Sequence, residues 1–289
     1  METSSQKIIH DLELIHGEIS EYLANYSKIV RRSNSGNGFI YLGGEYGFEQ
    51  LPKEAVSIQD KLFKRFNNIS QIISILLIDS VDLHIKEFET CKETITSFIT
   101  QDDRTYIQNI QQVIQKTRKN FDDIKDVIIN LYPNSKNDPI LIPDTNALYA
   151  NTEIEKWEFE TFDKFIVALT PSVLSDLDKH KIEHRNESVR NKALKLINKI
   201  KEYRRRGKLS EMVHVVKDKI WIFTIANEPD FQKTLGWLDK ENDDDRLVAE
   251  TLEIIRKYGD RAVIVITSDI NLQNKLEMAN LSFLEPPEI

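Results

Sequence analysis

The sequence predicts two kinds of structure in succession, an all-α helical bundle followed by an α/β domain with a mostly parallel sheet. Apolar residues recur at helical spacing through most of the first 131 residues. Beyond residue 139, short apolar runs alternate with helical patterns, as they do in doubly wound sheets. The polar, proline-containing stretch 132–139 separates the two patterns. We therefore expect one domain over residues 1–139 and a second over residues 140–289.

Composition limits the function classes. The 289 residues are 40% hydrophobic and 30% charged, which is ordinary for a globular protein. The N-terminus lacks a basic segment followed by an apolar one, and the most apolar run, 72–79, is far shorter than the roughly 20 residues that span a bilayer. We expect an unexported, cytoplasmic protein with no membrane partner. Because Cys91 is the single cysteine, cysteine-based zinc sites are excluded and a metal would be bound by oxygen.

The first domain is predicted to be helical throughout, apart from one loop. Helical patterns cover residues 5–31, 53–66, 70–100 and 104–131. The Gly-rich, aromatic stretch 36–48 lacks the Lys-Ser or Lys-Thr pair of a P-loop, so we expect a structured loop or a short hairpin. Helical bundles serve in regulation or in oligomerisation, and the pattern does not select between these roles. We expect the domain to form a homo-oligomer or to bind a regulatory protein.

The second domain alternates strands with helices. Strands are predicted at residues 140–142, 165–169, 213–216, 220–224 and 262–267. Helices are predicted at residues 153–162, 172–185, 188–206, 243–258 and 272–279. In such a sheet the carboxyl ends of the parallel strands form the crevice in which ligands bind.

Four aspartates occupy the positions where this crevice is expected. Asp144 and Asp269 follow apolar runs, and Asp176 and Asp245 lie near the starts of predicted helices on the same edge. Clustered carboxylates repel one another, and a cation relieves that repulsion. Mg²⁺ and Mn²⁺ prefer oxygen ligands, and two such ions can catalyse in-line displacement at a phosphodiester. The pattern therefore predicts a metal-dependent site for phosphodiester hydrolysis.

Each aspartate also has a simpler explanation when it is considered alone. Asp245 can stabilise a helix N-terminus through the helix dipole, Asp144 can form a turn, and Asp269 can cap a helix. Asp176 and its neighbour Asp178 can both be solvated. The order of the four motifs favours the site over these separate explanations.

The motifs are Ile-Pro-Asp144-Thr-Asn-Ala-Leu, Thr-Pro-Ser-Val-Leu-Ser-Asp176-Leu, Asn-Asp-Asp-Asp245-Arg-Leu-Val-Ala and Ile-Thr-Ser-Asp269-Ile-Asn. In these motifs residues 140–289 resemble the PIN-domain nucleases. The resemblance implies a three-layer α/β/α sandwich, dependence on Mg²⁺ or Mn²⁺, and hydrolysis of RNA, or less often DNA, in toxin, defence or RNA-processing roles. Two features depart from the family pattern. Asp176 stands where the family usually has Glu, which would reduce activity, and Pro143 precedes Asp144.

The resemblance assigns roles to the acidic residues and their neighbours. Asp144, Asp245 and Asp269 would hold one metal ion, and Asp176 would position a second ion or the attacking water. Supporting contacts to the metal ligands are expected from Asp243, Asp244 and Asn271. Thr145 and Asn146 would donate hydrogen bonds to a carboxylate or to a substrate phosphate.

One segment is basic although the chain carries a net charge of −8. Twelve Lys or Arg lie between Lys179 and Lys208, against three Glu, and the predicted helix there ends in Arg204-Arg205-Arg206. Such a helix can bind the backbone of a nucleic acid, in the first place RNA. Cations also stabilise a helix C-terminus without any ligand. We expect the three arginines to bind substrate.

Two alternatives to a nuclease stay open. The Asp176 and Pro143 departures are compatible with a catalytically weak PIN-like protein that binds RNA or serves as a scaffold. A different Mg²⁺-dependent phosphohydrolase on a Rossmann-like sheet is less favoured, because the Asp-x-Asp-x-Thr spacing of a haloacid-dehalogenase site is absent at Asp144.

Overall fold

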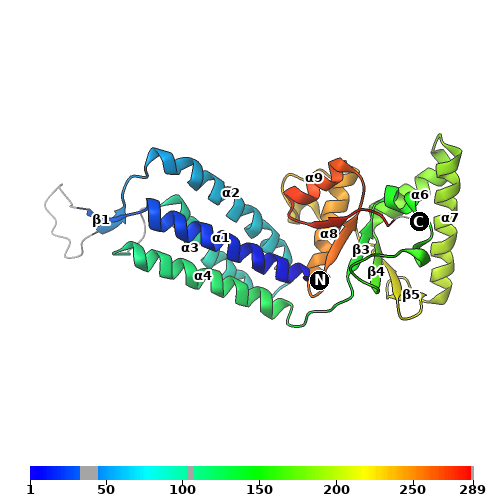
Figure 1. Cartoon of the computed structure of the whole chain (residues 1–289), viewed down its shortest axis with the longest axis horizontal. Helices are drawn as coiled ribbons and strands as arrows, with labels where there is room; N and C mark the ends of the chain where they lie inside the picture. Colours follow the sequence, from blue (N-terminus) through cyan, green and yellow to red (C-terminus); the bar gives the residue numbers. More distant parts are fainter. Residues whose placement is uncertain (33–44, 103–106, 288–289) are drawn as a thin grey trace. The chain divides into compact units, whose positions relative to one another are not determined.

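The computed structural model describes residues 1–32, 45–102 and 107–287, and the chain divides into two compact units (Figure 1). One unit comprises Gln6–Pro133. The other comprises Asn134–Ile289 together with Met1–Ser5.

The helical unit is built from α1 (Ser4–Tyr26), α2 (Lys53–Leu76), α3 (Asp82–Thr100) and α4 (Ile110–Leu131). Its core is aromatic at the centre: Phe121 of α4 packs edge-on against Phe66 of α2, with ring centroids 5.7 Å apart. The Tyr22 hydroxyl of α1 donates to the carbonyl of Ile99 at 3.2 Å. The predicted all-helical character of this region is confirmed.

Three boundaries in this unit differ from the predicted ones. The first helix ends at Tyr26 rather than at residue 31, because β1 (Ile29–Arg32) pairs antiparallel with β2 (Glu45–Phe48) and takes the β-branched Ile29 and Val30 into a strand. The last residues of the Gly-rich stretch form β2, whereas its residues 36–44 lie outside the described part of the chain.

The break between the next two predicted helices lies at 77–81, since α2 continues through 67–69. The fourth helix begins at Ile110 rather than at residue 104. The Asn109 side chain caps this helix by accepting a hydrogen bond from the Gln112 N–H at 3.0 Å. Residues 103–106 are not described.

The second unit contains a sheet of strand order β5-β6-β4-β3-β7-β8. Neighbouring strands are parallel except for β5 and β6, which are antiparallel. The strands are β3 (Ile140–Pro143), β4 (Phe165–Leu169), β5 (Val213–Val216), β6 (Ile220–Thr224), β7 (Val263–Ile266) and β8 (Ser282–Leu284). Every residue of β3, β4 and β7 is buried, as expected for central strands covered on both faces. The predicted α/β class with a mostly parallel sheet is confirmed.

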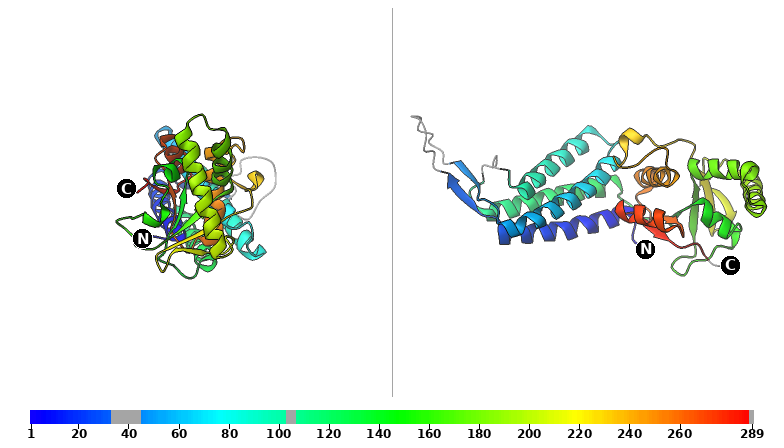
Figure 2. Two further views of the ribbon diagram at one scale, coloured as in Figure 1. Left: turned by 90° about the vertical axis from the view of Figure 1, so that its right-hand side faces the viewer. Right: turned by 90° about the horizontal axis from the view of Figure 1, so that it is seen from above.

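Helices cover both faces of this sheet. Figures 1 and 2 show α8 and α9 on one side and α6 and α7 on the other. The helices are α5 (Thr145–Ala150), α6 (Pro171–Glu183), α7 (Glu187–Arg206), α8 (Asp243–Tyr258) and α9 (Ile270–Met278), with single 3₁₀ turns at Ile154–Lys156 and Phe231–Lys233. In the described part of the chain, no helix is long and apolar enough to cross a membrane.

One predicted helix of this unit is wrong. Residues 153–162 form the short 3₁₀ turn and then a tight reversal in which Phe159 pairs with Phe162. These two rings stack at 4.8 Å, and both contact Phe165 edge-on at the start of β4. Aromatic packing therefore overrides the local helical pattern. The sequence did not predict α5 or β8.

Residues outside 140–289 complete this unit. The Ser4 N–H donates to the Arg261 carbonyl at 2.9 Å, and the Ser4 hydroxyl accepts from the Val263 N–H at 3.1 Å at the start of β7. Arg261 donates to the Asp138 carbonyl at 2.8 Å, and Lys136 pairs with Asp260 at 2.5 Å. Two segments therefore hold the loop before β7: one precedes the helical unit in the sequence, and the other follows it.

Candidate acidic site

Asp144 lies between the end of β3 and the start of α5, at the carboxyl edge of the sheet. Its Oδ1 accepts the Ala147 N–H at 2.5 Å, which caps α5, and its Oδ2 accepts the Thr267 hydroxyl at 2.5 Å. The residue is only 7% exposed. Burial raises the pKa of Asp144, and the negative charges of Asp269 and Asp244 raise it further, against the lowering by the two hydrogen bonds. The ionised carboxylate is therefore held in an unfavourable environment that a cation would improve.

Asp269 follows the neighbouring strand β7 and caps α9. Its Oδ1 accepts the Asn271 N–H at 2.8 Å. Its own N–H donates to the Thr267 hydroxyl oxygen at 3.0 Å, and that hydroxyl donates to Asp144. The fully buried Thr267 therefore connects the two acidic residues. This threonine lies within the fourth sequence motif, but the motif by itself predicts no role for it.

Asp176 lies on α6, one turn after the helix begins. It is half-buried, accepts the Thr145 hydroxyl at 3.3 Å and lies 3.9 Å from the Lys179 ammonium group. Burial raises its pKa, with a further contribution from the charge of Asp243. Asp178 is exposed and pairs with Lys181 instead. Because two residues on a helix differ by about 200° in direction, Asp176 is the α6 aspartate that faces the site.

Asp245 occupies the first turn of α8 and is 7% exposed. Its Oδ2 accepts the Asp239 N–H at 2.9 Å. Its Oδ1 is buried and accepts no aligned hydrogen bond, although the Lys275 Nζ of α9 lies 2.8 Å away. The lysine directs its hydrogen bonds to the Asn242 amide oxygen at 2.8 Å and to Asp244 at 3.3 Å.

Lys275 is the internal cation of this end of the cluster. Burial lowers its pKa, but Asp245 and Asp244 outweigh that effect, so that the pKa of Lys275 lies above its usual value. The sequence contains no signal for this pairing, because it depends on how α9 packs against α8.

The four predicted aspartates lie in one region of the structure, but their carboxylates do not meet at a single point. Charge coupling links Asp144 to Asp269 and Asp244, and Asp176 to Asp243, while Thr145 joins Asp176 to the segment that follows Asp144. Among the described residues, no three His, Cys, Asp or Glu side chains are arranged closely enough to hold a metal ion. Each carboxylate is instead held by donors of the chain. Carboxylate oxygens are nonetheless the donors that a hard cation such as Mg²⁺ or Mn²⁺ prefers, and Asp144 and Asp269, which have no ion pair among the described residues, fit that chemistry better than Asp245, which is paired with Lys275.

The predicted supporting residues differ in their surroundings. Asp244 pairs with Lys275, whereas Asp243 is exposed and lies 3.6 Å from Arg246. Asn146 and Asn271 are exposed at the starts of α5 and α9. The Thr145 hydroxyl is engaged by Asp176, so Asn146 has the freer side chain of the two.

Glu250 is a buried carboxylate that none of the sequence motifs indicates. It accepts the Ser172 N–H at 2.9 Å and the Ser172 hydroxyl at 2.5 Å. The N-cap residue of α6, Thr170, makes no side-chain capping bond, so Glu250 of α8 caps α6 from another helix. Burial raises the pKa of Glu250 despite these hydrogen bonds. The contact ties the helix that carries Asp176 to the helix that carries Asp245.

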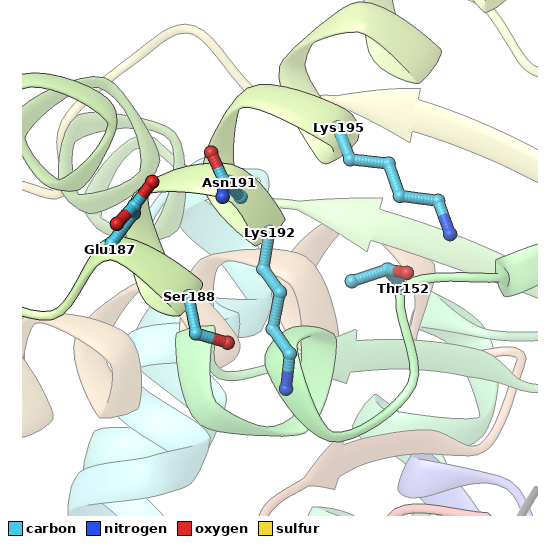
Figure 3. A pocket seen from close by; sticks show the side chains of 6 residues that line it. All are labelled: Thr152, Glu187, Ser188, Asn191, Lys192 and Lys195. Atoms are coloured by element: carbon cyan, nitrogen blue, oxygen red, sulfur yellow. The ribbon is translucent and has the colours of Figure 1, made fainter.

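Lysines of the basic segment make contacts within the unit. Lys192 donates to the Tyr149 carbonyl at 2.9 Å, Lys195 pairs with Glu153 at 3.3 Å, and Lys199 pairs with Glu155 at 2.6 Å. Figure 3 shows Lys192 and Lys195 extending from α7 beside Thr152. They border a pocket of about 490 Å³ lined by Thr152, Glu187, Ser188, Asn191, Lys192 and Lys195. These lysines therefore hold the segment after α5 against α7.

The three arginines lie at the other end of α7. Arg204 and Arg205 are exposed, whereas Arg206 pairs with Glu202 at 2.6 Å and donates to the Val215 carbonyl at 3.0 Å on β5. β5 is three positions from β3 in the sheet, which corresponds to roughly 14 Å at about 4.8 Å per strand. A nucleic acid would have to extend over the β6 and β4 positions to contact both the arginines and Asp144.

Comparison with known proteins identifies the second unit. Residues 141–284 match the family model of the PIN domain. The matched segment begins at the second residue of β3 and ends with β8, so that it contains five strands of the six-stranded sheet whole and all but the first residue of β3. A search of curated proteins found no match to the chain.

Proposed function

The C-terminal half of the chain belongs to the PIN-domain family, whose members are in general nucleases, and from this membership we propose that the protein is a Mg²⁺- or Mn²⁺-dependent endoribonuclease. The observation that supports the proposal most is the pair Asp144 and Asp269. They follow adjacent parallel strands, share Thr267 as a hydrogen-bonding link, and are coupled by charge.

The mechanism assigns separate tasks to the acidic residues. Asp144, Asp269 and Asp245 would hold a divalent cation, and Asp176 would position a second ion or the attacking water. When bound, such ions activate water and stabilise the leaving oxygen of a phosphodiester. Thr267 fixes the orientation of Asp144 by donating its hydroxyl proton, which leaves the remaining lone pairs of that carboxylate available. Thr145 fixes Asp176 in the same way.

Substrate contacts are proposed at two places. Asn146, exposed beside Asp144, would contact a phosphate near the scissile bond, and the hydroxyl of Thr145 would orient Asp176 behind it. Arg204 and Arg205 would contact phosphates further along the strand, and Arg206 would do so while it anchors the end of α7 to β5. The action on RNA, the cytoplasmic location, and regulatory or oligomerising roles of residues 1–139 stay predictions.

A nuclease assay tests the proposal. Single-stranded RNA, structured RNA and DNA are incubated with the full chain in Mg²⁺, in Mn²⁺ and with chelator. Asp144→Asn and Asp269→Asn should each reduce cleavage by more than about 100-fold, because loss of even an outer partner of a metal ligand costs about 10- to 100-fold. Asp178→Asn is the matched control, since that exposed aspartate lies on the same helix as Asp176 and should leave cleavage unchanged. Cleavage at the wild-type rate in Asp144→Asn would refute the assignment.

A second candidate function has one specific observation in its favour. The ion pair between Lys275 and Asp245 already neutralises an acidic residue that a metal would need. A catalytically weak PIN-like protein that binds RNA without cutting it would keep this pair intact. Binding of RNA without cleavage in either metal would favour this second function over the first.

A further inference from the structure

The β5–β6 hairpin carries two rings on one face of the sheet. His214 and Trp221 are directly opposite each other in the antiparallel pairing, and their ring centroids are 5.3 Å apart with the planes tilted by 45°. Val213 and Ile222, the next pair along, are buried on the opposite face. His214 is exposed and Trp221 is partly exposed, so the two rings form an open aromatic surface.

A basic groove adjoins these rings. It has a volume of about 370 Å³ and lies where the end of α7 meets β5. Its lining includes the side chains of Arg206, Lys208, Lys217 and His214. Glu211, the acidic residue of the lining, is 3.6 Å from the Lys208 ammonium group, so the positive charge of the groove exceeds the negative.

The basic groove and the aromatic rings lie side by side on a chain whose net charge is −8. A groove rich in cations attracts a polyanion, and the neighbouring rings of Trp221 and His214 offer π-faces on which a base can stack. Single-stranded nucleic acid supplies both partners at once, because its bases stack on aromatic rings and its phosphates pair with Lys and Arg. A duplex offers the phosphates only, since its bases are already stacked.

We propose that the face formed by His214, Trp221, Arg206, Lys208 and Lys217 is a binding subsite for single-stranded RNA, with a base stacked on the two rings and phosphates in the groove. The inference rests on the proposed nuclease function, for which it names a substrate class and a path. β5 is an edge strand three positions from β3, and Trp221 is level with Ile140, the end of β3 opposite Asp144, through the pairing of both with Ile166. The subsite is therefore separated from Asp144 by three strand spacings across the sheet and four residues along β3, and it binds the substrate several nucleotides from the point of cleavage.

The β5 strand has a second feature that suits this role. Its pairing with β6 shifts register between His214 and Val216, which is a β-bulge. Bulges bend a strand and redirect its side chains, and they occur often beside functional sites. Arg206 donates to the carbonyls of His214 and Val215 at this irregularity, so its guanidinium group is held against the backbone of the strand that carries His214.

Binding of a fluorescently labelled single-stranded RNA to the full chain, measured by anisotropy with chelator present, tests the subsite without cleavage. Trp221→Leu and His214→Ala should each weaken binding by about 5- to 150-fold, the range that stacking energies of about 1–3 kcal/mol give. Trp221→Phe, which keeps an aromatic ring, should restore most of the affinity. Lys217→Glu should reduce the slope of log affinity against log salt by about 0.7. Binding of double-stranded RNA should change less with the ring variants.

Intrinsic tryptophan fluorescence gives a signal that would not change on RNA binding if Trp221 served only to stabilise the fold. RNA should quench the emission of wild type, and the quenching should be largely lost in Trp221→Phe, while the matched control Trp237→Phe should keep it. Unchanged affinity in Trp221→Leu and His214→Ala, in a protein that cleaves RNA, would overturn the subsite alone. If wild type does not cleave in either metal but the ring variants still lose affinity, the nuclease function fails and the subsite stands.

Discussion

Glu250→Ala tests the contact that ties α6 to α8. The substitution leaves the Ser172 N–H without its acceptor, which costs about 1–3 kcal/mol, and removes one buried methylene at about 0.8 kcal/mol. The Ser172 hydroxyl can turn to Thr170, whose hydroxyl lies 3.2 Å away, so its loss adds less. Relief of the buried charge offsets part of the total. We expect the free energy of unfolding to fall by about 1–3 kcal/mol, and the Tm of this unit to fall by roughly 2–12 °C.

Glu250→Gln is the matched variant. Its amide oxygen can still accept the Ser172 N–H, so its stability at pH 7 should lie within about 1 kcal/mol of wild type. Because burial raises the folded-state pKa of Glu250 above its usual value, the protonated form is favoured in the folded protein. The stability of wild type relative to Glu250→Gln should therefore be greatest below the unfolded-state pKa, near pH 4.5, and decline as pH rises through the folded-state pKa.

Differential scanning calorimetry of the full chain from pH 4 to pH 8 measures both quantities. The reasoning is refuted if Glu250→Ala costs less than about 1 kcal/mol, or if Glu250→Gln is as damaging as Glu250→Ala. A stability difference between wild type and Glu250→Gln that grows in favour of wild type with rising pH would also contradict the direction of the pKa shift.

Three other predictions concern the metal, the basic helix and the domain boundary. Mn²⁺ should raise the Tm of wild type, measured by thermal denaturation. This rise should be abolished in Asp144→Asn and only reduced in Asp245→Asn. Equal rises in wild type and both variants would exclude binding of the metal at this cluster. The double substitution Arg204→Glu and Arg205→Glu should lower the slope of log RNA affinity against log salt by about 0.7 for each phosphate that is no longer neutralised. It should leave the Tm unchanged, because neither arginine holds the fold as Arg206 does. An unaltered slope would show that the two residues are only solvated. A fragment of residues 134–289 should be more stable to urea than one of residues 140–289, since the shorter fragment lacks the hydrogen bonds and ion pairs of Lys136 and Asp138; equal midpoints would show that these interactions contribute nothing.

The sequence predicted those parts of the fold that have a strong local pattern. The central strands β3, β4 and β7 are continuous apolar runs because both of their faces are buried, and such runs can be recognised from sequence alone. The six-residue α5 and the three-residue β8 are too short to show a periodicity. The error at 153–162 has a different cause, since the packing of Phe159 and Phe162 on Phe165 is a tertiary contact that no local pattern contains.

The same division applies to the site. Asp144 and Asp269 were predictable because they follow apolar strands, and parallel strands end at a common edge. Thr267, Glu250 and Lys275 were not, because each acts through a partner distant in sequence: Asp144 lies 123 residues from Thr267, and Ser172 lies 78 residues from Glu250. The motif supplies the charged groups, and only the fold shows what holds them.

Lys275 shows how unevenly charge is compensated within the acidic cluster. It lies on α9, six residues after Asp269, which is the N-cap residue of the same helix. One short helix therefore contributes an acid beside Asp144 and a cation to the acids of α8. The consequence is an uneven cluster, in which Asp245 and Asp244 are already compensated while Asp144 and Asp269 repel each other without a partner cation among the described residues. A divalent ion relieves most repulsion at Asp144, which is why we expect Asp144→Asn to abolish the stabilisation by Mn²⁺ and Asp245→Asn only to reduce it.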